Sequence, residues 1–228
     1  MDLRAFLELL VSTEKPLLPG STALWLALHL GWALVLGSGV MLLAGRLAER
    51  YQWALSLLLL VWTLLPGPVS PAYWLGLVFQ APSLTSVVLC LGCVLGRLRR
   101  RQGRGCGIAA LDPRALKILL VFGIALGWLL LLDTLACLPV SVYAWGFASA
   151  AVVAMLVLAA LLWLVRGSRV SVLPFIVLAL FVTGRWPTGN LWDALLDPLL
   201  WLALQVGWLV SGWRRWTLAR RERSATRA

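Results

Sequence analysis

The spacing most suggestive of chemistry in this chain is Cys90-Leu-Gly-Cys93, a C-x-x-C pair. In a soluble redox domain this spacing is typical of a dithiol couple. Here the pair lies in the long apolar run LTSVVLCLGCVLG, and hydrocarbon disfavours the thiolate that redox exchange and metal binding need. We therefore interpret Cys90 and Cys93 as small buried hydrophobic residues.

The single histidine, His29, lies within a second apolar run, LWLALHLGW. An ionisable side chain at such a position is a candidate binding residue. The alternative is a histidine that makes one hydrogen bond to a neighbouring helix. Because a structural zinc site takes four ligands and bis-histidine haem takes two histidines, we expect no metal and no cofactor.

Four charged residues near the ends of apolar runs form a second candidate binding cluster: Asp133, Arg185, Asp193 and Asp197. A lone carboxylate in lipid is costly, so Asp133 is expected to face the protein interior, a partner or the interface. Arg185 is its natural ion-pair partner, and Asp197 is placed to favour the start of the last helix. The alternative is a set of separate solvated charges at helix ends.

The usual catalytic signatures are missing. The sequence contains no P-loop, no H-E-x-x-H and no G-x-S-x-G, and its last apolar run has no lysine for a retinal Schiff base. We therefore predict no catalytic residues.

Composition places the chain in the membrane class. Hydrophobic residues make up 61 % of it, charged residues 13 %, and the mean hydropathy is +0.91. The sequence predicts an all-α transmembrane bundle over 21–213, preceded by a short amphipathic helix within 1–20 and followed by a basic tail over 214–228. The expected spans, seven within a range of six to eight, are 21–44, 51–67, 73–96, 115–138, 148–165, 170–184 and 195–213.

The basic residues fix the expected orientation. Loops rich in arginine, at 46–50, 97–117, 166–169 and 214–228, alternate with charge-poor connections at 68–72, 139–147 and 185–194. The positive-inside rule then places the N-terminus outside and the C-terminus in the cytoplasm. The segment RLRRRQGRGCG (97–107) is thus a topology anchor in contact with the lipid bilayer, and we expect no nucleic-acid partner despite the net charge of +11.

Three connecting segments look alike. TLLPGPVSPAYW (63–74) and TLACLPVSVYAW (134–145) share T-x4-P-V-S-x3-W, and TGRWPTGNLW (183–192) follows the pattern loosely. They predict three related hairpins added to a lone first helix. The alternative is that such turns simply favour Pro, Thr and Trp in a chain with 14 tryptophans.

The bias towards arginine, with lysine only at Lys15 and Lys117, suggests a bacterial protein of the inner membrane. We expect a non-catalytic subunit or assembly factor of a membrane complex, partnered by another membrane protein or a second copy of the chain. The alternatives are a small-solute or lipid transporter and, third, a membrane-embedded enzyme.

Overall fold

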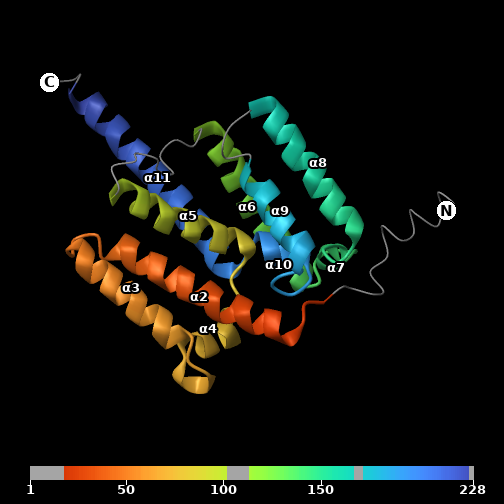
Figure 1. Ribbon diagram of the computed structural model, residues 1–228. Coiled ribbons are helices and arrows are strands. Elements are labelled where there is room, and N and C mark those ends of the chain that lie inside the picture. The colour runs from red at the N-terminus through yellow and green to blue at the C-terminus, as the bar shows by residue number, and fades with distance from the viewer. Residues whose placement is uncertain (1–17, 102–112, 167–171, 226–228) are drawn as a thin grey trace.

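The computed structural model describes residues 18–101, 113–166 and 172–225, and every regular element in these ranges is helical (Figure 1). Most of the amphipathic segment predicted within 1–20 lies outside them. The elements are α2 (Ser21–Leu43), α3 (Glu49–Thr63), the 3-10 turn η1 (Gly67–Val69), α4 (Pro71–Phe79), α5 (Leu84–Arg101), α6 (Pro113–Thr134), α7 (Val142–Trp145), α8 (Ser149–Arg166), α9 (Val172–Gly184), α10 (Leu191–Leu195) and α11 (Pro198–Ala225).

After α2, one order of elements occurs three times. Each unit has a long helix, a turn, a short helix and a second long helix: α3–α4–α5, then α6–α7–α8, then α9–α10–α11. The turn and the start of each short helix coincide with the three similar sequence segments. The described fold is therefore one helix plus three units of the same design.

The short helices α4, α7 and α10 also begin in the same way. In each, the residue before the helix accepts a backbone N–H of the first turn with its side chain. These caps are Ser70, Ser141 and Asn190, which are residue types strongly preferred at that position. Ser70 and Ser141 are the serines of the shared P-V-S motif, so the repeated motif has a structural role.

The third predicted span, 73–96, is not one helix. Gln80 has a φ of 61°, in the left-handed region that L side chains rarely adopt, and it ends α4. Pro82 cannot continue a helical hydrogen-bond ladder, and α5 begins after Ser83. The break is held in place by Trp32 on α2, whose Nε1–H donates to the Gln80 carbonyl at 2.9 Å.

The structure does not confirm seven spans. Two helices of the described residues, Ser21–Leu43 and Lys117–Thr134, are long and apolar enough to cross a membrane. The helices Leu84–Leu98, Ser149–Val165 and Val172–Gly184 are apolar but shorter. The third predicted span is interrupted at 80–83, and α3 and α9 have only 15 and 13 residues.

The buried core lies where α5, α8, α9 and α10 meet. Its members include Met155, Val177, Phe181 and Leu191, the last two with no exposed surface. A second contact joins α2 and α3, which lie side by side in Figure 1.

Gly37 on α2 lies at the contact with α3. A Cβ added at Gly37 would lie 3.7 Å from the Ser56 Cβ, and the Ser56 hydroxyl donates to the Gly37 carbonyl at 3.1 Å. Small side chains at such contacts let helices approach closely.

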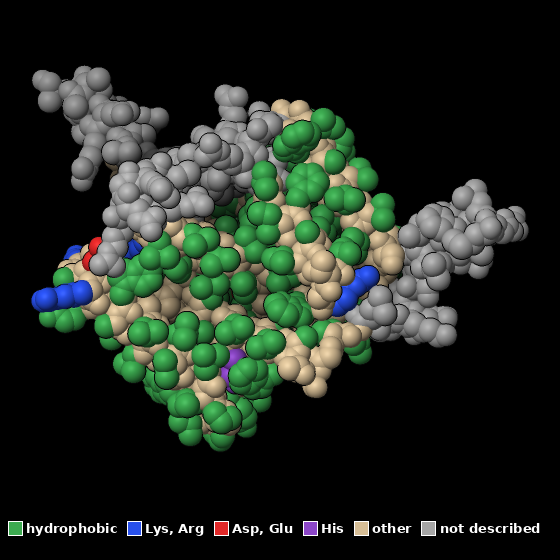
Figure 2. Space-filling view, viewed as in Figure 1, with side chains coloured by type: hydrophobic (Ala, Val, Ile, Leu, Met, Phe, Trp, Pro, Cys, Tyr) green, Lys and Arg blue, Asp and Glu red, His purple; other side chains and the backbone are tan. Residues whose placement is uncertain are grey.

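Outside this core the described surface is largely apolar. Hydrophobic side chains cover most of the face seen in Figure 2, and the few charged ones lie at its edges. Many large hydrophobic residues are more than half exposed, including Leu43, Val78, Leu164 and Trp213. Such a surface exceeds the apolar patches of ordinary soluble monomers.

Candidate functional site

Asp197 lies at the centre of a buried polar network that joins two helix starts. Its Oδ2 accepts from the Ser83 backbone N–H (2.9 Å), the Ser83 hydroxyl (2.7 Å) and the Ser86 hydroxyl (2.5 Å). Its Oδ1 accepts from the Leu200 N–H at 2.7 Å. Asp197 is 8 % exposed and Ser83 is fully buried. The carboxylate thus ties the start of α11 to the start of α5.

The local sequence explains the two helix starts. Pro198 is the first residue of α11, where its fixed φ suits a helix and its missing N–H costs nothing. Asp197 precedes it and caps the first turn. In the same way Ser83 precedes α5 and accepts from the Ser86 N–H at 3.1 Å. Both helices present N–H groups and positive dipole ends to one carboxylate, which stabilises its negative charge.

A second polar network lies beside α7 and α10. The Tyr143 hydroxyl donates to Asp193 Oδ2 at 2.8 Å, and Thr188 donates to the same oxygen at 2.5 Å. The backbone N–H of Tyr143 donates to Asp133 Oδ2 at 2.7 Å, and Ser141 donates to that oxygen at 3.3 Å. Tyr143 therefore links the two carboxylates Asp133 and Asp193.

This environment perturbs the tyrosine. Burial raises the pKa of Tyr143 above its ordinary value, and the charge of Asp193 and the hydrogen bond to it raise that pKa further. Each cause favours the neutral phenol, because a phenolate beside a carboxylate would be repelled and would lose its donor role. The Tyr143 hydroxyl therefore keeps its proton at neutral pH and acts as a hydrogen-bond donor to Asp193.

The turns of the second and third units dock directly against each other. Asn190, fully buried, donates from Nδ2 to the Tyr143 carbonyl at 3.0 Å. The Leu191 N–H donates to the Gly146 carbonyl, and Trp192 Nε1–H donates to the Val142 carbonyl, both at 2.9 Å. The free carbonyls at the end of α7 thus accept from the start of α10, which satisfies both helix ends.

The expected ion pair between Asp133 and Arg185 does not form within the described part of the chain. The donors nearest to Asp133 are those at the start of α7, which follows it in sequence. The Arg185 guanidinium lies over the ring of Phe181 on α9, the helix that ends just before Arg185, 5.2 Å from the ring centre. Of the four predicted cluster residues, the structure joins Asp133 to Asp193 through Tyr143 and places Asp197 in a separate network.

His29 is buried on α2, at 5 % exposure. Its Nδ1 lies 3.0 Å from the Trp25 carbonyl, and its ring stacks on Trp25 with centroids 4.3 Å apart. Both contacts are within one helix, rather than with a neighbouring helix as the sequence suggested. The ring is packed and has a hydrogen-bond partner.

The cysteine pair lies half-buried on α5. The Cys90 carbonyl accepts from the Ser38 hydroxyl at 3.3 Å. Within the described ranges, no three His, Cys, Asp or Glu side chains gather in a way that could hold a metal ion.

At the opposite end of α5, one residue of the arginine-rich segment has a tertiary role. Arg97 donates from Nη1 to the Gln52 side-chain carbonyl at 2.5 Å, and from Nη2 to the Met41 carbonyl near the end of α2. Gln52, 5 % exposed, in turn donates to the Leu47 carbonyl at 2.8 Å. Arg97 thus joins α2, α3 and α5.

Sequence reasoning missed the partners of the carboxylates: Ser83, Ser86, Tyr143 and Thr188. One signal was present, since Pro82-Ser83-Leu84-Thr85-Ser86 places serines at the capping position and three residues later. Reading 73–96 as a continuous span hid that helix start. The bond from the Tyr143 hydroxyl had no local signal, because its partner Asp193 lies 50 positions away. Thr188 lies five positions before Asp193, and its role was not predicted.

Comparison of the chain with protein families, with curated proteins and with solved structures gives no match. The geometry of the site is therefore the basis for any statement about function.

The two networks stabilise helix ends. The Oδ2 atom of each carboxylate accepts two or three hydrogen bonds. Among the described residues, every buried side-chain nitrogen or oxygen has a hydrogen-bond partner. The three carboxylates are thus engaged in hydrogen bonds that connect parts of the chain.

Proposed function

We propose that this protein is a non-catalytic component of a membrane complex, embedded in a bacterial inner membrane by about seven helical segments. The observation that carries the proposal is that its interior polar side chains are engaged in holding helices to one another. Asp197 and Asn190 each join elements from different units, and Arg97 joins α5 to α3 and to the lone helix α2. Two long apolar helices and the apolar surface support the membrane location.

Transport of a polar solute is the weaker alternative. Such a function needs polar groups that face a water-filled path near the middle of the bilayer. His29, the ionisable residue at that depth in the predicted first span, is packed against Trp25. The cavity between α5, α6, α8, α9 and α11 has an apolar lining, which also disfavours a polar substrate.

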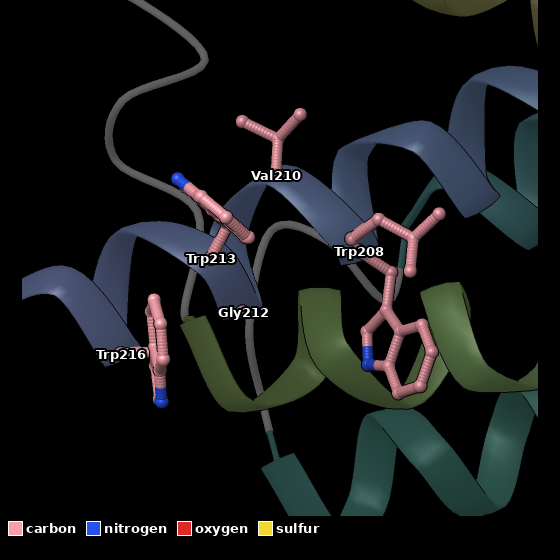
Figure 3. Close-up of a pocket in the computed structure, with 6 residues that line it drawn as sticks. Trp208, Val210, Gly212, Trp213 and Trp216 are labelled. Carbon is pink, nitrogen blue, oxygen red and sulfur yellow. The ribbon is translucent and has the colours of Figure 1, made fainter.

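Helix α11 offers the surface that a partner helix would contact. It packs mainly against α6, and it also carries an open hollow of about 570 Å³ lined by Trp208, Leu209, Val210, Gly212, Trp213 and Trp216 (Figure 3). A Cβ added at Gly212 would meet nothing within 4 Å. A helix from another membrane protein could approach closely there, because small residues allow close backbone contact in lipid.

The test is photocrosslinking in living cells with benzoylphenylalanine placed at Trp213 of the full chain. Its matched control is Leu164 on α8, which has similar exposure, 71 % against 67 %. We expect position 213 to give one discrete protein adduct and position 164 to give none. An adduct of twice the chain's own mass would make the partner a second copy, and identical lipid-only labelling at both positions would contradict the proposal.

A further inference from the structure

An apolar cavity of about 490 Å³ lies between two parts of the bundle. Helix α6 packs against α11 and α7, whereas α8 packs against α9 and α9 against α5. Few close backbone contacts join α6 to α5, α8 or α9, so a space remains between these two groups of helices. All five of these long helices, together with the end of α10, contribute lining residues.

The lining offers nothing to a polar ligand. Its residues carry no ionisable side chain, and the one hydroxyl among them, that of Thr85, donates to the Ala194 carbonyl at 3.5 Å. Water is held in a protein cavity when two to four polar partners surround it, which this lining lacks. An empty space of this size would deprive its lining atoms of van der Waals partners. Hydrocarbon is the filler that suits the cavity.

The cavity has a closed end and an open side. The closed end is formed by four lining residues that are each at most 9 % exposed: Leu126, Met155, Val177 and Leu196. Of these, Leu196 directly precedes Asp197 in the sequence. In contrast, four other lining residues are between 42 % and 44 % exposed: Ile118, Leu158, Val172 and Ile176. These residues mark an opening between α6, α8 and α9.

A basic residue lies beside that opening. Lys117 precedes Ile118 near the start of α6 and is exposed. In the sequence, Arg114 lies three positions before Lys117, and Arg166 is the last residue of α8. In the proposed topology this is the cytoplasmic side, where anionic headgroups attract basic residues.

We infer that this cavity binds one acyl chain of an anionic phospholipid of the inner leaflet. The acyl chain enters between α6, α8 and α9, and its terminal methyl group reaches the part of the cavity lined by Leu196. The headgroup of the lipid stays beside Lys117. The volume is within the usual range of small-ligand pockets, about 300–1,000 Å³. The inference rests on the membrane location in the proposed function but not on the partner of α11.

The test uses full-length protein in phosphatidylcholine vesicles that contain phosphatidylglycerol with a photoreactive diazirine near the end of one acyl chain. After illumination, the labelled peptides are mapped by mass spectrometry. We expect labels on α6, α8 and α9 at residues that line the cavity, and much less with the same probe on a phosphatidylcholine headgroup.

Two valines provide a matched pair of variants. Val172→Trp narrows the opening, and Val157→Trp adds the same side chain on α8 outside the lining, at 53 % exposure against 44 %. We expect Val172→Trp to lower cavity labelling by at least about fivefold, a loss of about 1 kcal/mol in binding, and Val157→Trp to leave it unchanged. Ala159→Phe, which fills the interior, provides a second variant should Val172→Trp fail to accumulate.

Three outcomes would contradict the inference. Labels spread evenly over α3 and α8 would mean that the probe reacts only from the surrounding bilayer. Equal labelling of the Val172→Trp and Val157→Trp variants would mean that the acyl chain does not enter the cavity. Equal labelling by the phosphatidylcholine probe would contradict the preference for an anionic headgroup. Alkaline carbonate extraction tests the membrane location independently. A protein that stays in the membrane pellet but shows no labels in the cavity would contradict this inference and leave the proposed membrane location intact.

Discussion

Asp197 shows how a carboxylate is held in an apolar bundle. Burying an ionised side chain costs several kcal/mol unless donors replace the lost water. Here two hydroxyls and two backbone N–H groups do so, and both N–H groups belong to starting turns of helices. The residue thereby couples α5 of the first unit to α11 of the third.

Replacing Asp197 by Asn tests this coupling. The amide keeps the shape but loses the charge and turns one donor towards Ser83 or Ser86, so we expect a loss of about 1–3 kcal/mol in the free energy of unfolding. Unfolding of the purified protein in detergent micelles measures it. Ser211→Ala, an exposed serine on the same helix, is the control and should change little. Unchanged stability of Asp197→Asn would show that the network is not a tie between the helices.

Tyr143 predicts a response to alkaline pH. Because its pKa is raised in the folded chain, the folded state holds the phenol proton more tightly than the unfolded state does. That stabilisation is complete below the unfolded pKa of about 10 and is lost as the pH rises above it. The melting temperature should therefore fall as the pH rises beyond about 10, and Tyr143→Phe should flatten this slope. An equal slope in both proteins would contradict the assignment.

At the scale of elements, the short helices α7 and α10 hold the second and third units together. Their contact leaves no spare room, since a Cβ added at Gly146 would lie 1.9 Å from Asn190 Oδ1. Asn190 is fully buried and caps α10 while it bonds to Tyr143, so it cannot move aside without losing both interactions.

Gly146→Ala is therefore expected to destabilise the protein by about 1–3 kcal/mol, the usual cost of overpacking. The control is Gly207→Ala on α11, where an added Cβ meets nothing within 4 Å. That change should be neutral or slightly stabilising, because alanine favours helix more than glycine does. Thermal unfolding of the two variants side by side measures the difference, and equal melting temperatures would mean that the α7–α10 contact is loose.

At the scale of the whole molecule, one helix is followed by three units of one design. Helix α11 runs unbroken from Pro198 to Ala225, through the boundary at 214 that the sequence predicts between bundle and tail. Because it is 28 residues long, it measures about 42 Å and exceeds a hydrocarbon core of about 30 Å. Its basic end therefore extends beyond the bilayer in the proposed topology.

The topology is tested with two of the chain's own cysteines. In single-cysteine proteins, a membrane-impermeant maleimide added to intact cells should label Cys137 and not Cys106, because only the first lies on the predicted outer side. Cys106 should react after the membrane is opened. Labelling of Cys106 alone in intact cells would mean that the orientation is the reverse of the predicted one. Labelling of both Cys106 and Cys137 in intact cells would contradict the single span predicted between them.

The amino-acid sequence by itself determined the all-α class, the apolar character and the position of most helices, because these follow from local composition and periodicity. It also indicated the three related turns, whose capping serines act on neighbouring residues. It did not determine the break at Gln80 or the partners of Asp197 and Asp133. Those depend on contacts between residues up to 114 positions apart, such as Ser83 with Asp197. Only the tertiary structure decided them, since the donors that hold a buried carboxylate come from whichever helix ends the packing brings together.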